Sequence, residues 1–159
     1  MTDVPGAVDG DDVAELEMMT RALIGITLQS LEALGDQVSL PQFRLLLAAS
    51  TLGRVPSSRL AEAVGVPASS VTRLADKLEA AGLLGRGTDA RNRSIVTIEI
   101  TGAGRSLVAR VVRRRHELLA AVLTRMEPAE RTAVAAAAAR FTALAADAAE
   151  RGAAGPLPL

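Results

Sequence analysis

The sequence predicts a mainly α-helical fold with one small β-hairpin. Apolar residues recur at helical spacing along most of the chain, whereas residues 95–100 alternate with the period of a strand. Glycine and proline divide the helical patterns into short central segments and longer flanking ones. The expected order is a long helix, a central lobe that holds the hairpin, and further long helices.

Composition excludes several classes of protein. Of the 159 residues, 49% are hydrophobic, which is enough for a core, but none is cysteine and only one is histidine. Disulfides, thiolate zinc sites, thiol redox sensing and histidine-rich metal sites are thereby excluded. The sequence shows neither an apolar run of the ~18 residues that a membrane span needs nor a signal-peptide pattern. We therefore expect a cytoplasmic protein with no membrane partner, metal or cofactor.

The formal net charge is zero, but the charges are unevenly distributed. Residues 1–40 hold eight acidic residues and one arginine, a net charge of −7. Residues 54–115 hold twelve basic and five acidic residues, a net charge of +7. A basic middle of this kind indicates an anionic partner for that part of the chain.

The N-terminal region is expected to supply a dimer contact. Residues 1–10 are acidic and lack periodicity, so they are predicted to form a flexible arm. Residues 11–38 contain a helical apolar pattern that stops at Gly35. A helix of about 24 residues is longer than a small core requires. We therefore assign residues 11–38 to an N-terminal dimerisation helix.

The next helix has clear start and stop signals. Ser39 and Gln42 have the spacing of a capping box, Pro41 suits the first turn, and Gly53 ends the pattern. The residues predicted to form its buried face are Phe43, Leu46, Leu47 and Ser50.

Residues 56–84 predict two short helices joined by a tight turn. Gly65 can adopt the positive φ that ends the first helix, and Pro67 suits the start of the second. Ser57 or Ser58 is expected to cap the first helix. The predicted buried residues are Leu60, Ala61 and Val64 in the first helix and Val71, Leu74, Ala75 and Leu78 in the second. This pattern is typical of a helix-turn-helix, although structural helix pairs can share it.

The solvent face of the second helix is expected to enter a DNA major groove. It offers short hydroxyl side chains near its start and cations farther along, which suits the reading of base edges. The candidates for base contacts are Ser69, Ser70, Thr72 and Arg73. Arg73 is the expected guanine reader, and Lys77 is assigned to phosphate.

A two-stranded hairpin with a basic tip is predicted directly after this helix. Leu83–Arg86 is expected to form its first strand and Ile95–Ile100 its second, with a polar turn between them. The arginines expected to reach phosphate or a minor groove are Arg86, Arg91 and Arg93. A helix-turn-helix followed by such a hairpin is typical of a winged helix. The alternative for the tip is an ordinary solvated loop.

Two further long helices are predicted over residues 101–151. Thr101 suits an N-cap, Pro128 separates the two helices, and the second is rich in alanine. Because alanine buries little area, the last helix needs broad contact to be held. We therefore assign residues 39–100 to a winged helix-turn-helix lobe, 101–151 to C-terminal dimerisation helices and 152–159 to a flexible tail.

The order and spacing of these motifs resemble the multiple-antibiotic-resistance regulator (MarR) family of winged-helix transcriptional regulators. The segments that carry the resemblance are LPQFRLL at 40–46, LAEAVGV at 60–66, SVTRLADKLEAAGLL at 70–84 and ITGAGR at 100–105. It covers nearly the whole chain apart from residues 1–10 and 152–159. The family's long first and last helices, which interlock as a dimer, are similar to the flanks predicted for this chain.

The wing departs from the family pattern. Asn92 and Ser94 stand where the family has the acid and the arginine of an ion pair. Asp89 and Arg91 are candidates for a displaced pair. Whether the altered motif weakens DNA binding is left open by the sequence.

The resemblance implies a sequence-specific DNA-binding transcriptional regulator, a repressor, that acts as a homodimer on a pseudo-palindromic operator. It also implies release from double-stranded DNA by a small aromatic or anionic effector. The residues suggested for the effector pocket are Leu28, Leu31, Phe43 and Leu47, whose alternative role is plain core. An enzyme is not expected, because no nucleophile and base pair is evident. The alternatives are a winged-helix protein-interaction module and a non-specific architectural DNA binder.

Overall fold

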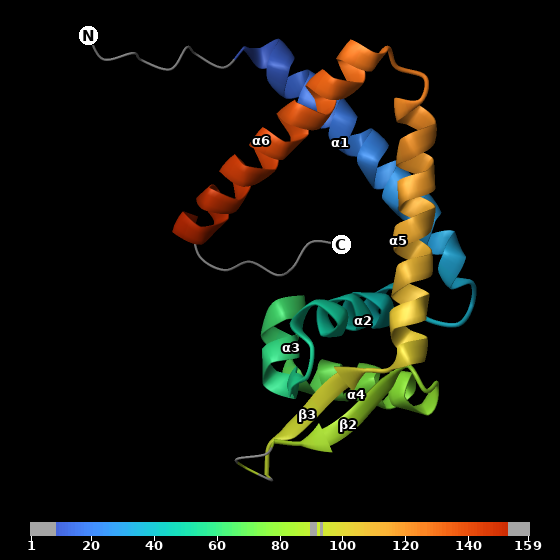
Figure 1. Cartoon of the computed structure of the whole chain (residues 1–159). Helices are drawn as coiled ribbons and strands as arrows, with labels where there is room; N and C mark the ends of the chain where they lie inside the picture. Colours follow the sequence, from blue (N-terminus) through green and yellow to red (C-terminus); the bar gives the residue numbers. More distant parts are fainter. Residues whose placement is uncertain (1–8, 90–91, 93, 153–159) are drawn as a thin grey trace.

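Two long helical arms rise from a small lobe in which short helices pack on a three-stranded sheet (Figure 1). This computed structural model describes residues 9–89, 92 and 94–152. The elements in chain order are α1 (Gly10–Ser30), η1 (Leu31–Leu34), α2 (Leu40–Leu52), β1 (Val55–Pro56), α3 (Ser57–Val64), α4 (Ala68–Ala80), β2 (Leu84–Thr88), β3 (Val96–Ile100), α5 (Gly102–Leu123) and α6 (Pro128–Gly152). The mainly helical fold class with a winged lobe is confirmed.

The predicted N-terminal helix is present as α1 followed by the 3₁₀ turn η1. The Asp9 carboxylate accepts a hydrogen bond from the Asp11 N–H at 3.2 Å and so caps the first turn. Gly35, at φ +54°, ends the helical path at the predicted residue. The arm and the tail predicted at the two ends lie mostly outside the described residues.

Helix α2 is the centre of the lobe. Its predicted capping box is formed, with the Ser39 N–H donating to Gln42 Oε1 at 2.7 Å. Phe43 and Leu46 are buried as predicted, but the prediction for Ser50 is wrong, because its side chain is exposed. Leu45 is fully buried instead. The neighbours of α2 decide which of its residues are buried. Because α2 contacts α3, α4, α5 and β3, its buried face is wider than a one-sided stripe and includes Leu45, whereas Ser50 lies outside it.

The helix-turn-helix consists of α3 and α4. Gly65 adopts the left-handed conformation at φ +70°, and its N–H donates to Ala61 O at 2.9 Å. The fully or nearly fully buried residues are Leu60, Val64, Val71, Ala75 and Leu78, all on the predicted faces. The predicted serine cap of α3 is wrong: the helix begins at Ser57 itself, Pro56 takes the N-cap position, and no side chain bonds there.

The wing is larger than the predicted hairpin. Its strands run in the order β1-β3-β2, because the extended segment before α3 adds a third, antiparallel strand. The first hairpin strand begins and ends later than predicted, at Leu84 and Thr88, and the second begins at Val96. Leu84, Ile98 and Ile100 face the helices and are buried.

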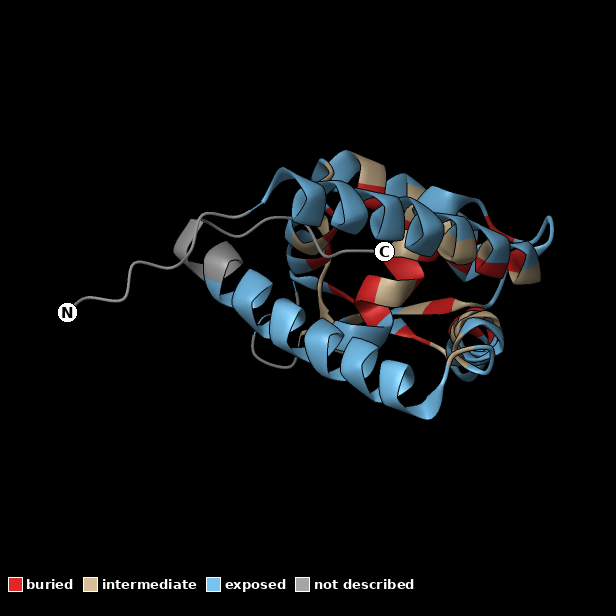
Figure 2. Ribbon diagram, turned by 90° about the horizontal axis from the view of Figure 1, so that it is seen from above, coloured by how far each residue is buried: buried red, intermediate tan, exposed pale blue. Residues whose placement is uncertain are grey.

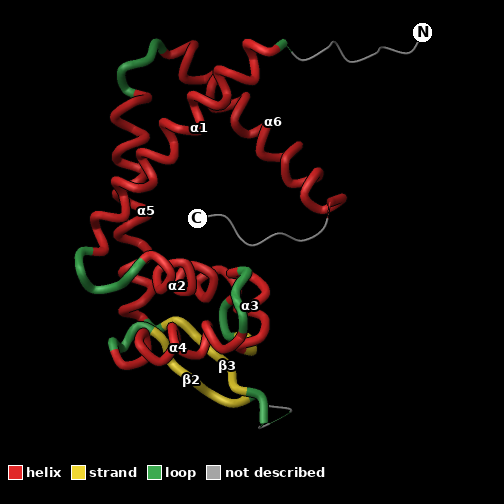
Figure 3. Tube along the Cα trace, turned by 180° about the vertical axis from the view of Figure 1, so that it is seen from behind, coloured by secondary structure: helices red, strands yellow, loops and turns green. Residues whose placement is uncertain are grey.

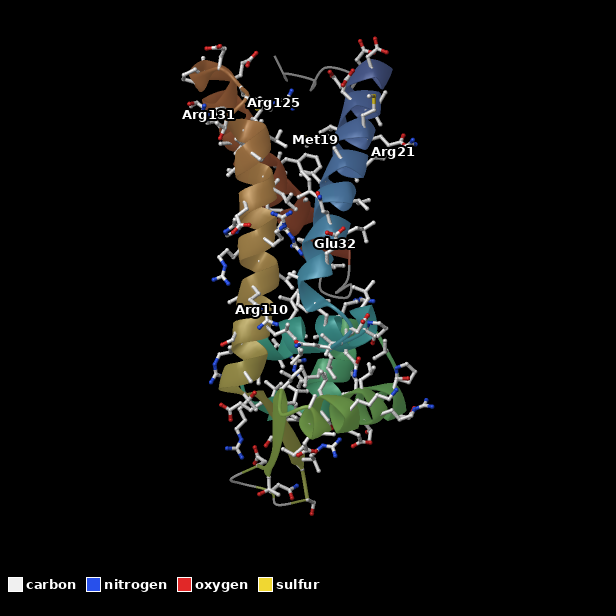
Figure 4. All side chains as sticks on the ribbon, turned by 90° about the vertical axis from the view of Figure 1, so that its right-hand side faces the viewer. Met19, Arg21, Glu32, Arg110, Arg125 and Arg131 are labelled. Atoms are coloured by element: carbon white, nitrogen blue, oxygen red, sulfur yellow. The ribbon has the colours of Figure 1, made fainter. Side chains whose placement is uncertain are left out.

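Helix α5 joins the lobe to α6. Thr101 caps it as predicted, its hydroxyl accepting from the Gly104 N–H at 3.1 Å. Helices α1 and α5 lie side by side, as Figures 3 and 4 show from two directions. Helix α6 then folds back over open space, and its described side chains are exposed along its length (Figure 2).

Candidate nucleic-acid interface

Helix α4 presents a polar surface on the side of the lobe away from α2. Ser69, Thr72, Arg73 and Lys77 are exposed, and Ser70 is half-buried. The opposite face of the helix is fixed by buried Val71, whose side chain belongs to the core. Among the described residues, Arg73 and Lys77 form no salt bridge, so both cations are available to an anionic ligand.

Arg86 has different surroundings from Arg73. Its Nη2 donates to Asp76 Oδ1 at 2.5 Å and to Thr72 O at 3.3 Å, and its Nη1 lies 3.4 Å from Glu79 Oε2. The guanidinium therefore connects strand β2 to two carboxylates and one carbonyl of α4. This arrangement attaches strand β2 to the helix, and it compensates two negative charges beside the surface that carries Arg73.

Backbone turns stabilise the described part of the wing loop. The Asp89 carboxylate accepts from the Asn92 N–H at 3.0 Å, and Asn92 Oδ1 accepts from the Ser94 N–H at 3.0 Å. Asx turns of this kind order a loop through local side-chain to backbone bonds. The two residues predicted for the tip, Arg91 and Arg93, lie outside the described residues, and so does the expected Asp89–Arg91 pair.

The four residues suggested for an effector pocket have unequal surroundings. Phe43 is 1% exposed and belongs to the core, Leu31 and Leu47 are half-buried against that core, and Leu28 is 55% exposed on α1. Hollows of about 320 Å³, 260 Å³ and 210 Å³ border the described part of the wing instead, and the smallest is lined by Thr72, Arg86 and Ile98. The two larger hollows are both lined by Arg54 and Thr97.

Large apolar side chains are exposed along α1, at the far end of α5 and along α6. They are Val13, Leu16, Met18, Met19, Leu23, Ile24 and Leu28 in α1, Val122 in α5, and Val134, Phe141 and Leu144 in α6. Phe141 is 56% exposed, although it is one of only two phenylalanines in the chain. Large apolar side chains exposed in such number are typical of an interaction site.

Three residues at the polar surface of α4 and the wing have roles that the sequence did not predict. Asp76 and Glu79 were not linked to Arg86, although two carboxylates three residues apart on a DNA-facing helix are a signal that a nearby cation must compensate them. Arg54 was predicted to lie in the basic middle of the chain and in a brief extended segment, but no contact was assigned to it. It bonds to two wing residues that lie 34 and 43 positions later, and no local pattern indicates such contacts.

The described residues hold neither a clustered metal site nor a helix of membrane-spanning character. Within the ranges that the structure describes, no group of three or more histidine, aspartate or glutamate side chains is placed to hold a metal ion. Over the same part of the chain, no helix combines the length and the apolarity that crossing a bilayer requires.

Comparison with known proteins gives a consistent result. Residues 38–96 match the model of the MarR family. YfiV of Bacillus subtilis (strain 168), described as an HTH-type transcriptional regulator, is 28% identical over 97 residues, a match that spans 61% of this chain and 61% of that protein.

Solved structures extend the likeness beyond the matched lobe. RV1404 from Mycobacterium tuberculosis is 28% identical, with a TM-score of 0.77 over 87% of this chain and 96% of that one. The fold is also shared with a point mutant of S. aureus MepR bound to an oligodeoxyribonucleotide, which is 19% identical, with a TM-score of 0.65 over 82% of this chain and 95% of that one. The winged lobe is thus similar to the MarR family, whose model it matches over residues 38–96, and the long helices around it are similar to those of the solved structures.

Proposed function

We propose that this protein is a transcriptional repressor that binds a pseudo-palindromic operator as a homodimer, with helix α4 of each subunit in a major groove. The observation that carries the proposal is the polar face of α4, on which exposed Arg73 and Lys77 have no acidic partner among the described residues while Arg86 compensates Asp76 and Glu79. A DNA-facing helix needs this distribution, because uncompensated carboxylates would repel phosphate.

Base recognition is assigned to the N-terminal half of α4. Ser69, Ser70 and Thr72 provide short hydroxyl groups, and Arg73 can form the bidentate contact with guanine O6 and N7. Lys77 is assigned to phosphate, as are Arg91 and Arg93 of the wing, where a minor groove is the other target. The MepR mutant is bound to an oligodeoxyribonucleotide, and we extend DNA binding to this chain by shared fold.

The homodimer is assigned to α1, α6 and the far end of α5. Each of these helices exposes large apolar side chains, and α6 has no extended packing against the rest of its own described chain. A second copy that covers these faces would bury them. Two-fold recognition further requires that this dimer hold its two copies of α4 about one DNA turn, or about 10 bp, apart.

The proposal includes release from DNA by a small aromatic or anionic effector, which the resemblance to the family implies. Leu31 and Leu47 are half-buried beside Phe43, whereas Leu28 is exposed. A ligand at this position would need the second subunit as one wall, so its binding would couple to the dimer and hence to the spacing of the two lobes.

Selection of binding sites from a random double-stranded pool tests the proposed function. The expected product is a motif of two inverted half-sites whose centres lie about one helical turn apart. Enrichment of a single half-site would contradict the dimeric mode, and enrichment of no motif would favour the architectural binder. Retention of no DNA at all would favour the protein-interaction module.

A further inference from the structure

The third strand gives the wing little support. Strand β1 has two residues, which pair with Ile98 and Thr97 of β3, and one of them is Pro56, which has no N–H to donate. Because the strand order is β1-β3-β2, β1 cannot contact β2 through its backbone. A two-stranded hairpin is only marginally stable in water, so the outer strand depends on further attachments. Arg86 provides one of them, to α4, near the middle of the strand.

The Arg54 side chain provides a contact that crosses the sheet. It extends from the residue before β1 over the outer face of β3, where its Nε donates to Thr97 Oγ1 at 3.1 Å. Its Nη2 continues to the outer strand and donates to Thr88 O at 3.0 Å. Thr97 is 4% exposed, and we attribute the burial of this hydroxyl on the outer face to the arginine that covers it. One side chain therefore links all three strands next to the wing loop.

The crossing depends on the absence of a side chain at Gly87. This residue pairs with Thr97 across the hairpin, directly beneath the guanidinium. A Cβ at position 87 would overlap with Arg54 Nη2 and would lie 3.2 Å from Arg54 Cζ. A Cβ at Gly85, two residues earlier on the same strand face, would meet nothing within 4 Å. The space needed by Arg54 is therefore specific to position 87.

We propose that Arg54 is a positioning residue that holds the wing at a fixed angle to the lobe, and that Gly87 is required to admit its guanidinium. The effect of this positioning on DNA binding rests on the proposed function, in which the wing contacts DNA. The geometric part, the fixed angle, is independent of any ligand.

A distance measurement tests the geometric part without DNA. The chain has no cysteine, so spin labels can be attached at Ser50→Cys on α2 and Ser94→Cys beside the wing loop, both exposed positions. The labelled protein is diluted with unlabelled chain so that only pairs within one subunit are observed. We expect one narrow distance distribution in the parent and in Gly85→Ala, and a broadened or shifted one in Arg54→Ala and Gly87→Ala.

Matched variants separate positioning from loss of fold. Thr97→Ser keeps the hydroxyl that accepts from Arg54 and should retain the parent distribution, whereas Thr97→Val has similar volume without the acceptor and should broaden it. Circular dichroism checks that each variant keeps its helices. Parent-like distributions in both Arg54→Ala and Gly87→Ala would overturn the proposal.

Binding to the selected operator tests the consequence for DNA. Arg54→Ala and Gly87→Ala should bind about tenfold more weakly, which is the loss expected when the displaced wing gives up one charge-assisted contact with DNA. Gly85→Ala should bind like the parent. In an Arg91→Ala, Arg93→Ala background, Arg54→Ala should cause no additional loss, because it acts through the wing. An equal loss in both backgrounds would overturn the action through the wing. Failure of the parent to bind DNA would refute the proposed function and leave the distance test unaffected.

Discussion

At the scale of single residues, two arginines near α4 differ in what surrounds them. Arg73 is exposed on the helix with no acidic partner among the described residues, whereas Arg86 bonds to Asp76 and to Thr72 O and lies beside Glu79. An arginine without a partner is ready to bind a base or phosphate, and one held by two carboxylates is engaged within the fold. The two residues should therefore respond differently to substitution.

Arg73→Ala should lower the affinity for the operator by about 1–3 kcal/mol and relax specificity at one base position, because a bidentate guanine contact is lost. Arg91→Ala should weaken operator and random DNA alike and reduce the salt slope by about one. Fluorescence anisotropy on both DNAs over a range of salt concentrations measures the two effects. Equal losses on operator and random DNA for Arg73→Ala would remove its role as a base reader.

Arg86→Gln should weaken operator binding about tenfold, because Asp76 and Glu79 would then face phosphate uncompensated. Adding Asp76→Asn and Glu79→Gln should restore most of the affinity, since the repulsion is removed with the charges. Anisotropy of the single and triple variants measures this. If the loss persists in the triple variant, Arg86 contacts DNA itself, as the sequence alone suggested.

At the scale of elements, the start of α5 is joined to the end of α4. The Thr101 hydroxyl donates to Gly82 O at 2.7 Å, and the Thr101 N–H donates to Leu83 O at 3.1 Å. Gly104 packs against the same turn, where a Cβ would overlap with Leu83 O and lie 2.7 Å from Ile100 Cγ1. Helix α5, which leads to α6, is thereby fixed to the end of α4, the helix proposed to read DNA.

Gly104→Ala should lower the free energy of unfolding by about 1–3 kcal/mol, because the added methyl meets backbone that cannot move aside. Gly102→Ala is the matched control, since a Cβ there meets nothing within 4 Å. Chemical denaturation followed by circular dichroism measures both. A Gly104→Ala protein as stable as the control would show that the junction can relax.

The elements that the sequence predicted well are those defined by local signals. The capping box at Ser39, the left-handed Gly65 and the Thr101 cap each depend on residues a few positions apart, and all three are formed. Contacts between distant segments were not predictable in this way. The bonds from Arg54 to Thr88 and Thr97 form only in the folded sheet. The burial predicted for Ser50 was wrong because the elements that surround α2 depend on the tertiary fold.

At the scale of the whole molecule, the single subunit leaves many large apolar side chains of its long helices exposed. The lobe has a continuous buried core, whereas α1 and α6 expose apolar side chains such as Leu16 and Phe141. Hydrophobic burial contributes roughly 25 cal/mol per Å², so an alanine-rich helix such as α6 is held only if it contacts a partner over much of its length. The proposed dimer would therefore contribute to stability as well as to the proposed mechanism.

Phe141→Asp should dissociate the homodimer, because it places a charge in the apolar face of α6. Ala143→Asp is the matched control: it lies two residues along the helix, about 200° away, and is also exposed. Sedimentation velocity measures the mass of each variant. A dimeric Phe141→Asp protein would place the interface elsewhere, and a monomeric Ala143→Asp protein would mean that the contact surrounds the helix.

Recognition of a specific DNA sequence by a dimer through α4 is the proposal on which the other roles depend. Its most direct test is fluorescence anisotropy of the parent protein on its selected operator and on a scrambled duplex, titrated over salt. We expect a preference of about a thousandfold or more for the operator, with two subunits bound to each site. Weak binding that is equal on both duplexes and steeply salt-dependent would contradict the proposal, because only a basic surface would then remain.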